Sequence, residues 1–203
     1  MNNMTCLIDA AAGELEVLRS CSTTNTAFPS ACLDLMHLLP GNNCCIDCGQ
    51  LNPQWASLSY GALICLQCCG KHRGFGVRTS FVRSIYMDSW SHSQVLTMLE
   101  GGNKQLSSFF DRHTLSRKAG FSPIIMGDNN EAINHKRYRT KAALFYREQL
   151  GLHVSRVVSS GTYRGREASR KTTQEPKKKS NTCIALVESD CNERRHSSTI
   201  YRE

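Results

Sequence analysis

Four cysteines in the middle of the chain constrain its fold more than any other feature. Cys45 and Cys48 are separated by two residues, as are Cys65 and Cys68, and sixteen residues lie between the two pairs. A two-residue gap lets a tight turn present two sulfurs to one ion, and a second pair completes the tetrahedron that zinc prefers. The spacing therefore predicts one Zn²⁺ site. Four protein ligands leave no open coordination position, so we expect this zinc to stabilise the fold rather than to be the catalyst.

The other cysteines and the start of the chain favour a reduced intracellular protein. Of eleven cysteines in 203 residues, four metal ligands leave an odd number, whereas secreted disulfide scaffolds usually hold an even number. The first residues lack the basic start and apolar run of a signal peptide. No stretch approaches the ~18 apolar residues of a membrane-spanning helix.

Composition divides the chain into three expected parts. We expect a flexible N-terminal extension over residues 1–29, a zinc-finger domain over residues 30–152, and a basic, disordered tail over residues 153–203, where Ser, Thr, Arg and Lys dominate. The formal net charge of +8 favours an acidic partner or an anionic membrane surface, but the charge alone does not distinguish these from nucleic acid. A lysine run at residues 177–179 could be a membrane-surface contact or a nuclear signal, but solubilisation of the tail is the default interpretation.

Local patterns predict an α+β fold in which helices surround a small, zinc-stabilised, three-stranded sheet. Ser91 and Gln94 have the spacing of a capping box, which starts a helix, and Gly151 is expected to end the longest helix. The expected elements are helices in residues 10–18 and 30–39, two short strands around Gly61, a strand in residues 81–87, a helix in residues 91–99, and helices in residues 104–111 and 131–150.

An arginine follows the second cysteine pair, and its neighbours resemble a known family. The sequence reads NPQWAS at residues 52–57, GKHRGFGV at 70–77, VRS at 82–84 and DSW at 88–90. Together with the cysteine spacing, these blocks are similar, in the same order, to the catalytic domain of the GTPase-activating proteins for ADP-ribosylation factors, the Arf GAPs. The resemblance covers about residues 32–150.

The resemblance implies a function that is completed in another protein. Arg73 would be an arginine finger that enters the site of a GTP-bound Arf-family small GTPase, and Trp55, Leu66, Met87 and Asp88 would contact the partner or support the finger. Relatives often carry Leu at the position of Met87. The chain would act as a GTPase activator in trans, not as a self-contained enzyme, on peripheral Golgi or other vesicle membranes in the cytoplasm.

Each of these residues also has a structural interpretation. Arg73 could be an ordinary surface arginine, Trp55 a core residue, Asp88 the cap of the helix near Ser91, and Leu66 and Met87 plain core. His72 precedes Arg73, but four cysteines already fill the zinc site, so we expect His72 to face solvent or to make a hydrogen bond.

Two other classes of protein share part of the pattern. A GATA-type DNA-binding zinc finger also has two cysteine pairs followed by basic residues. Residues 70–82 hold only three Lys and Arg residues, however, with apolar residues between them, so nucleic acid is not the favoured partner. A zinc-scaffolded adaptor without activity is the third class, against which the intact Arg73 argues.

Overall fold

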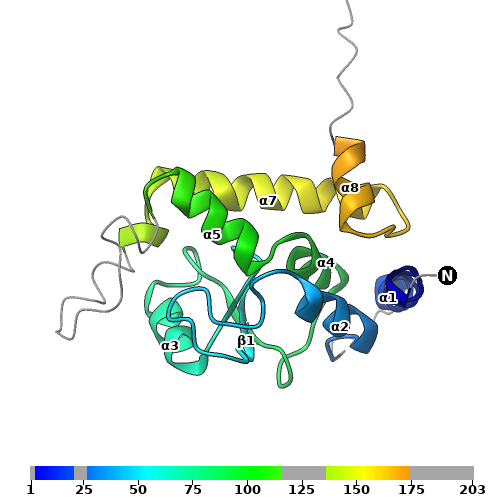
Figure 1. Cartoon of the computed structure of the whole chain (residues 1–203), viewed down its shortest axis with the longest axis horizontal. Helices are drawn as coiled ribbons and strands as arrows, with labels where there is room; N and C mark the ends of the chain where they lie inside the picture. Colours follow the sequence, from blue (N-terminus) through cyan, green and yellow to red (C-terminus); the bar gives the residue numbers. More distant parts are fainter. Residues whose placement is uncertain (1–2, 21–26, 116–135, 174–203) are drawn as a thin grey trace, which may run out of the picture.

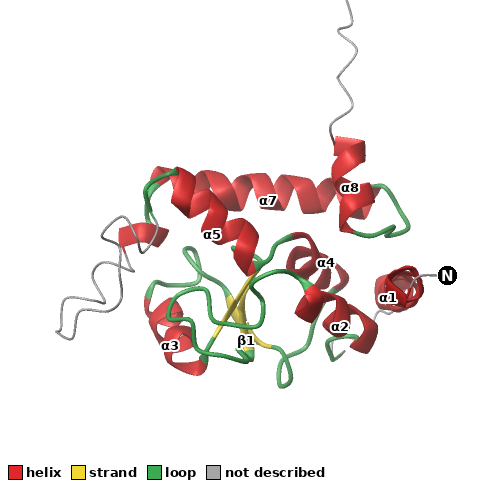
Figure 2. Cartoon of the chain, in the orientation of Figure 1, coloured by secondary structure: helices red, strands yellow, loops and turns green. Residues whose placement is uncertain are grey.

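The computed structural model describes residues 3–20, 27–115 and 136–173. It is an α+β structure in which helices surround one small sheet, as the sequence predicted (Figures 1 and 2). In chain order the elements are α1 (Asn3–Ser20), α2 (Ser30–Leu38), β1 (Trp55–Ser57), β2 (Ala62–Ile64), α3 (Leu66–Gly74), β3 (Val82–Ser84), α4 (His92–Glu100), α5 (Asn103–Arg112), α7 (Lys141–Ser159) and α8 (Arg166–Thr173).

The sheet is short, antiparallel and buried. Its order is β2-β1-β3, so β1 is central, and Ala56 pairs with Leu63 on one side and Arg83 on the other. Ala56 and Leu63 have no exposed surface. The two strands expected around Gly61 and the strand expected in residues 81–87 are therefore confirmed, although each is only three residues long.

The turn between β1 and β2 packs tightly against the link between α4 and α5. Gly61 has a φ of +57°, and its carbonyl accepts a hydrogen bond of 2.7 Å from the amide of Gly102. A Cβ on Gly101 would lie 2.5 Å from that carbonyl oxygen, which only glycine avoids. The side chain of Asn103 bonds both the amide and the carbonyl of Leu63, which ties the start of α5 to β2.

The helices that flank the sheet follow the predicted local signals. The capping box before α4 is present, because the Ser91 side chain accepts from the backbone at Gln94 while the Gln94 side chain accepts from the amide of Ser91. α2 begins at Ser30, the first residue of the expected helix, with Pro29 at the N-cap position. Trp90 and Leu96 are almost fully buried and contribute to the main hydrophobic core.

The N-terminal residues differ from the flexible extension that we expected. Asn3–Ser20 forms a continuous helix, α1, at the opposite end of the molecule from α3 (Figure 1). Ala11 and Leu15 are 0% and 1% exposed, so one face of α1 is buried. The carboxylate of Glu14 accepts hydrogen bonds from the amides of Ala31 and Cys32, at 2.8 and 3.1 Å, and so caps the N-terminus of α2.

The longest helix continues past the glycine that we expected to end it. α7 runs from Lys141 to Ser159, and Gly151 lies in its interior, so the predicted C-terminal cap is wrong. The helix continues because Leu150, Val154 and Val157 recur at helical spacing and are all buried. The first residues of the expected helix, 131–135, lie outside the described residues.

The start of the expected disordered tail is helical. α8 follows α7, and Arg170 donates a hydrogen bond of 2.9 Å to the carbonyl of Glu100. Glu100 is fully buried, and its carboxylate lies 2.7 Å from the Nε2 of His153 in α7. These polar contacts dock residues that the composition alone assigned to the tail. Residues 174–203, with the lysine run, lie outside the described residues.

Among the helices of residues 3–20, 27–115 and 136–173, not one has both the length and the apolar character needed to cross a membrane.

Candidate functional site

The four paired cysteines meet at one point beside the sheet. The sulfur atoms of Cys45, Cys48, Cys65 and Cys68 all lie within 4.8 Å of one another, and three of these residues are buried, with Cys48 exposed. Cys45 and Cys48 occupy a tight turn that Gly49 closes, with a φ of +79° and a hydrogen bond of 2.9 Å from its amide to the carbonyl of Cys45. The four cysteines are thus positioned to bind a metal ion.

The second cysteine pair begins α3. Cys65 directly follows β2 and is the N-cap of α3, and its sulfur accepts from the amide of Cys68 at 3.5 Å. The second pair of candidate metal ligands and the first turn of the helix are therefore one unit. Cys69 is buried beside this cluster, and Cys44 donates its thiol to the carbonyl of Gly41, so both lie outside the group of four.

The electrostatics of the cluster fit a bound dication. A hydrogen bond from the Cys68 thiol lowers the pKa of Cys45 to about 5, and the same bond, together with burial, raises the pKa of Cys68. Burial is the main cause that raises the pKa of Cys48 to about 11. Crowded thiolates repel one another, so the cluster by itself favours one anion and keeps its other protons. A divalent ion with affinity for sulfur would compensate the charge of all four thiolates.

Arg73 lies on the last turn of α3, on the surface. Its side chain is exposed, and its guanidinium carbon lies 4.8 Å from the centre of the Trp55 ring. Trp55 is half-buried at the start of β1, where it pairs with Ile64 and Ser84. The ring of Trp55, which we expected to support the finger, thus lies against the guanidinium of Arg73. An arginine stacked on an aromatic face gains a cation–π attraction.

Of the other residues predicted to contact the partner, two are exposed and one is half-buried. Leu66 and Met87 are 68% and 75% exposed, so neither is a core residue. Asp88 is half-buried, and its carboxylate accepts from the amide of Ser84 at 2.6 Å, which closes the turn after β3. Asp88 does not cap α4, because Ser91 holds that position.

A buried polar network next to Arg73 was missed from the sequence. His72 is 1% exposed, and its Nε2 and Nδ1 lie 2.8 Å from Asp47 Oδ2 and 2.7 Å from Ser80 Oγ. The other oxygen of Asp47 accepts from the guanidinium of Arg137 and, at 2.7 Å, from the hydroxyl of Tyr138. Burial by itself raises the pKa of Asp47, but His72 and Arg137 hold it well below its usual range.

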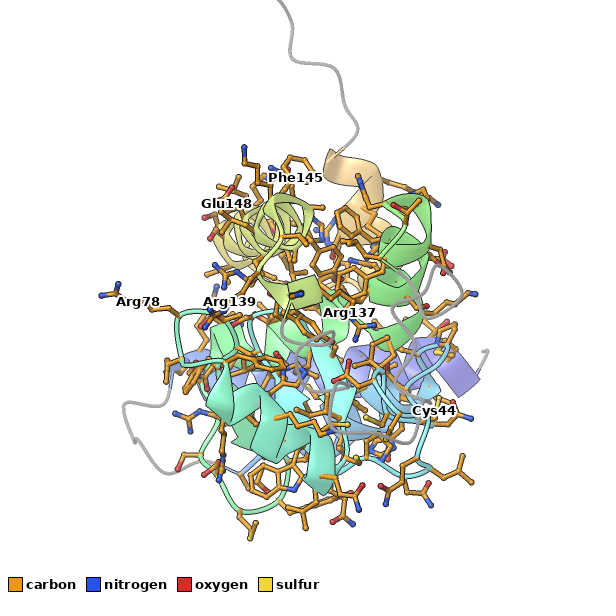
Figure 3. The ribbon with its side chains drawn as sticks, turned by 90° about the vertical axis from the view of Figure 1, so that its left-hand side faces the viewer. Cys44, Arg78, Arg137, Arg139, Phe145 and Glu148 are labelled. Atoms are coloured by element: carbon orange, nitrogen blue, oxygen red, sulfur yellow. The ribbon has the colours of Figure 1, made fainter. Side chains whose placement is uncertain are left out.

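The available sequence signal for this network was the position of Asp47 inside a Cys-x-x-Cys gap. A carboxylate there adds negative charge beside thiolates, which requires compensating partners. Figure 3 shows the contrast between Arg137, which lies within the molecule, and Arg78, which projects away from it. Sequence spacing could not reveal that Arg137, ninety residues away, supplies the compensation.

Comparisons with known proteins agree with this geometry. The family model ArfGap, assigned as GTPase activating proteins for Arf, matches residues 30–155. The chain belongs to the Arf GAP family. Its cysteine cluster and Arg73 therefore lie within the family's domain, whereas α1, the last turn of α7 and all residues beyond α7 lie outside the matched range.

Relatives and one solved structure extend the comparison. ADP-ribosylation factor GTPase-activating protein 3 of Mus musculus is 42% identical over 113 residues, which are 55% of this chain and 19% of the relative. ADP-ribosylation factor GTPase-activating protein GCS1 of Saccharomyces cerevisiae is 51% identical over 96 residues, which are 45% of this chain and 27% of the relative. The similarity thus spans about a fifth to a quarter of these two relatives. A crystal structure from Cryptosporidium parvum, of a protein assigned as a GTPase activating protein for ADP ribosylation factor, covers 63% of this chain and 96% of that chain, with a TM-score of 0.50 and 28% identity.

Proposed function

We propose that this chain accelerates GTP hydrolysis on an Arf-family small GTPase, with Arg73 as the arginine finger. One observation carries the proposal: the exposed Arg73 lies in the last turn of α3, and the N-cap and first turn of the same helix hold two of the four clustered cysteines. The names of the relatives support the same activity for the Arf GAP domain. The GTP, its magnesium ion and the glutamine that orients the attacking water would belong to the partner, so the chain acts in trans.

The chemistry that Arg73 would supply is charge stabilisation. Phosphoryl transfer spreads negative charge over the transferred oxygens, and a guanidinium is always charged and offers planar, forked donors to them. An arginine supplied in trans contributes on the order of 10³–10⁵ in rate, or roughly 4–7 kcal/mol of barrier. Because Arg73 is exposed beside Trp55, it can leave the surface of the chain and enter a partner's site without disturbing the core.

We propose that the four cysteines bind one structural Zn²⁺. Four thiolates form a complete tetrahedral set, and when bound the ion cross-links the turn at Cys45 and Cys48 to the first turn of α3. The ion would thereby supply folding free energy and hold the first turn of α3, the helix that carries Arg73. Metal analysis of the purified chain should give one zinc per molecule, and a value near zero in folded protein would refute the assignment.

The partner would cover the apolar side chains around the finger. Leu66 starts the same helix as Arg73, and Met87 lies beside Asp88 in the turn after β3. Large apolar side chains at this exposure are typical of a surface that a partner buries. Their burial would also remove water around Arg73 and so strengthen its attraction to phosphate.

DNA binding has less support. The buried side chains of α3, at Cys68, Cys69 and His72, are directed to the core, and Phe75 after it is buried too, so the helix has one exposed face with few cations. Specific DNA-binding helices are much more densely basic. Membership of the Arf GAP family does not favour DNA binding either.

We also propose that the chain acts peripherally on Golgi or other vesicle membranes. Its partner class supports this location, as does the lysine run at residues 177–179, which would add roughly 1 kcal/mol per charge at an anionic surface. Sedimentation with anionic and neutral vesicles would test this contact, and equal binding of a chain with these lysines changed to glutamine would exclude the run.

The experiment that tests the main proposal is GTP hydrolysis on purified Arf loaded with GTP. We expect the full chain to accelerate hydrolysis by orders of magnitude over Arf alone. No acceleration by folded, metal-loaded chain would leave the non-catalytic adaptor as the function.

A further inference from the structure

The last turn of α3 needs a support that the metal ligands do not provide. Cys65 and Cys68 hold the first turn, whereas Arg73 lies five residues beyond Cys68, or about 7.5 Å along the axis at ~1.5 Å per residue. A helix of nine residues is marginal by itself, and Gly70 in its middle weakens it further. A finger on an unsupported last turn would sample many directions.

His72 is the buried side chain of that turn. Both of its ring nitrogens have a partner, Asp47 on one side and Ser80 on the other, so the ring is fixed in position and in rotation. The ring also packs against Tyr138, with 4.6 Å between the ring centres. Successive residues of a helix project roughly 100° apart, so a fixed His72 sets the direction in which Arg73 leaves the backbone.

Asp47 connects His72 to two rigid parts of the molecule. It lies between Cys45 and Cys48 in the metal-binding turn, and it is 3% exposed. Its second oxygen is held by Arg137 and Tyr138, which are also almost fully buried. Because Asp47 is held from both sides, it cannot follow a movement of His72 and instead restrains it.

We propose that Asp47 and His72 are positioning residues for Arg73: their buried contact holds the last turn of α3 so that the finger is presented in one direction. This inference rests on the proposed function and deepens it. Neither side chain would touch the nucleotide. A displacement of about 1 Å at a catalytic group can cost on the order of 10²-fold in rate. Loss of the contact should therefore lower kcat by about 10- to 100-fold.

The chain offers a matched control for a merely structural role. Glu100 is also a buried carboxylate with a histidine and an arginine beside it, namely His153 and Arg170. It lies at the end of α4, and its partners come from α7 and α8, not from α3. Glu100→Gln and Asp47→Asn thus remove the same charge from the same kind of site. The Asp47 site contacts α3, whereas the Glu100 site does not.

The experiment measures kcat and KM for GTP hydrolysis on Arf with full-length variants, together with zinc content and thermal unfolding. We expect both Asp47→Asn and Glu100→Gln to unfold at lower temperature, but only Asp47→Asn to lower kcat, by about 10- to 100-fold at nearly unchanged KM. Ser80→Ala, the mildest change, removes the hydrogen bond on the other nitrogen of the His72 ring, and it tests whether a fixed His72 positions Arg73 if Asp47→Asn does not fold. His72→Gln can still reach Asp47 and should lose less activity than His72→Asn.

A double-mutant comparison with Arg73→Lys distinguishes a positioning role of His72 from a general loss of stability. In an Arg73→Lys background, His72→Asn should cost little further activity, because the group that it positions is already gone. ¹⁵N relaxation of the Arg73 Nε–H group gives a second measure, which needs no GTPase, and Asp47→Asn should make this group more mobile.

Each outcome has a defined meaning. Wild-type kcat in metal-loaded Asp47→Asn and Ser80→Ala, or an equal loss in Glu100→Gln, would overturn the inference. If the wild-type chain does not accelerate hydrolysis at all, the proposed function fails. The inference is then decided by Arg73 mobility alone, and unchanged mobility in Asp47→Asn overturns it.

Discussion

Arg73→Lys should separate activity from stability more cleanly than any other substitution in this chain. Arg73 is exposed, and its visible contact is the stack on Trp55 at 4.8 Å. An exposed cation–π pair is worth about 0.5–1 kcal/mol, and lysine keeps part of it, so stability should change by less than about 1 kcal/mol.

The expected effect on the rate is much larger than the effect on stability. An arginine finger contributes roughly 4–7 kcal/mol to the barrier, and lysine retains the charge but lacks the planar fork. We expect at least a ~100-fold loss, which corresponds to about 2.7 kcal/mol. The physical reason is that a compact ammonium lacks the planar pair of parallel N–H donors with which a guanidinium binds two oxygens.

The assay is single-turnover hydrolysis of GTP bound to Arf, with the chain in excess. Arg78→Lys is the matched control, because Arg78 is an exposed arginine close by in sequence that projects into solvent (Figure 3). We expect it to lose little activity. If Arg73→Lys, folded and metal-loaded, stays within about threefold of wild type, the finger assignment is wrong.

Three further predictions follow from the fold. Cys48→Ser should lose metal and tertiary structure together, because metal binding contributes on the order of 10 kcal/mol to such sites, and retained stoichiometric zinc would count against the ligand set. Gly101→Ala should lower the free energy of unfolding by about 1–3 kcal/mol, since its Cβ would lie 2.5 Å from the backbone of the β1–β2 turn. Gly13→Ala in α1 is the control and should be neutral or stabilising, because a Cβ there would have nothing within 4 Å. Equal denaturation midpoints for the two variants would contradict this. Stability should fall at alkaline pH, because burial raises the pKa of both Cys32 and Tyr60 to about 12, from ordinary values of 9 and 10. The unfolded chain therefore releases these protons first, so the stabilisation is complete below about pH 9 and is lost toward pH 12, by at most about 1.4 kcal/mol per pH unit for each group; a melting temperature that stays flat from pH 8 to 11 would refute it.

The sequence predicted the parts of the site that depend on local spacing. Two Cys-x-x-Cys gaps place their sulfurs through one turn each, and the capping box at Ser91 acts within four residues. The strands around Gly61 follow from a segment that alternates loosely and then becomes apolar. All of these signals are short-range, so they could be read without a tertiary fold.

Residue composition was a weaker guide at the two ends of the domain. The extension before residue 30 looked flexible because its helical pattern is short, but the Glu14 carboxylate accepts hydrogen bonds from the backbone amides at the start of α2. The residues after 152 looked like tail because they are basic, but Arg170 docks on α4. Each contact depends on a partner distant in sequence, which composition does not reveal.

Local sequence patterns were enough to predict the cysteine cluster, the small sheet and the arginine that follows the cluster. The exposure of Leu66 and Met87 could be seen only in the folded chain. The same holds for the contacts that Asp47 makes with His72 and Arg137 in the interior. The physical reason is the range of the interactions. Ligand gaps and caps act within one turn of the chain, whereas a buried carboxylate takes its partners from wherever the fold brings a cation, here from residues 25 and 90 positions away.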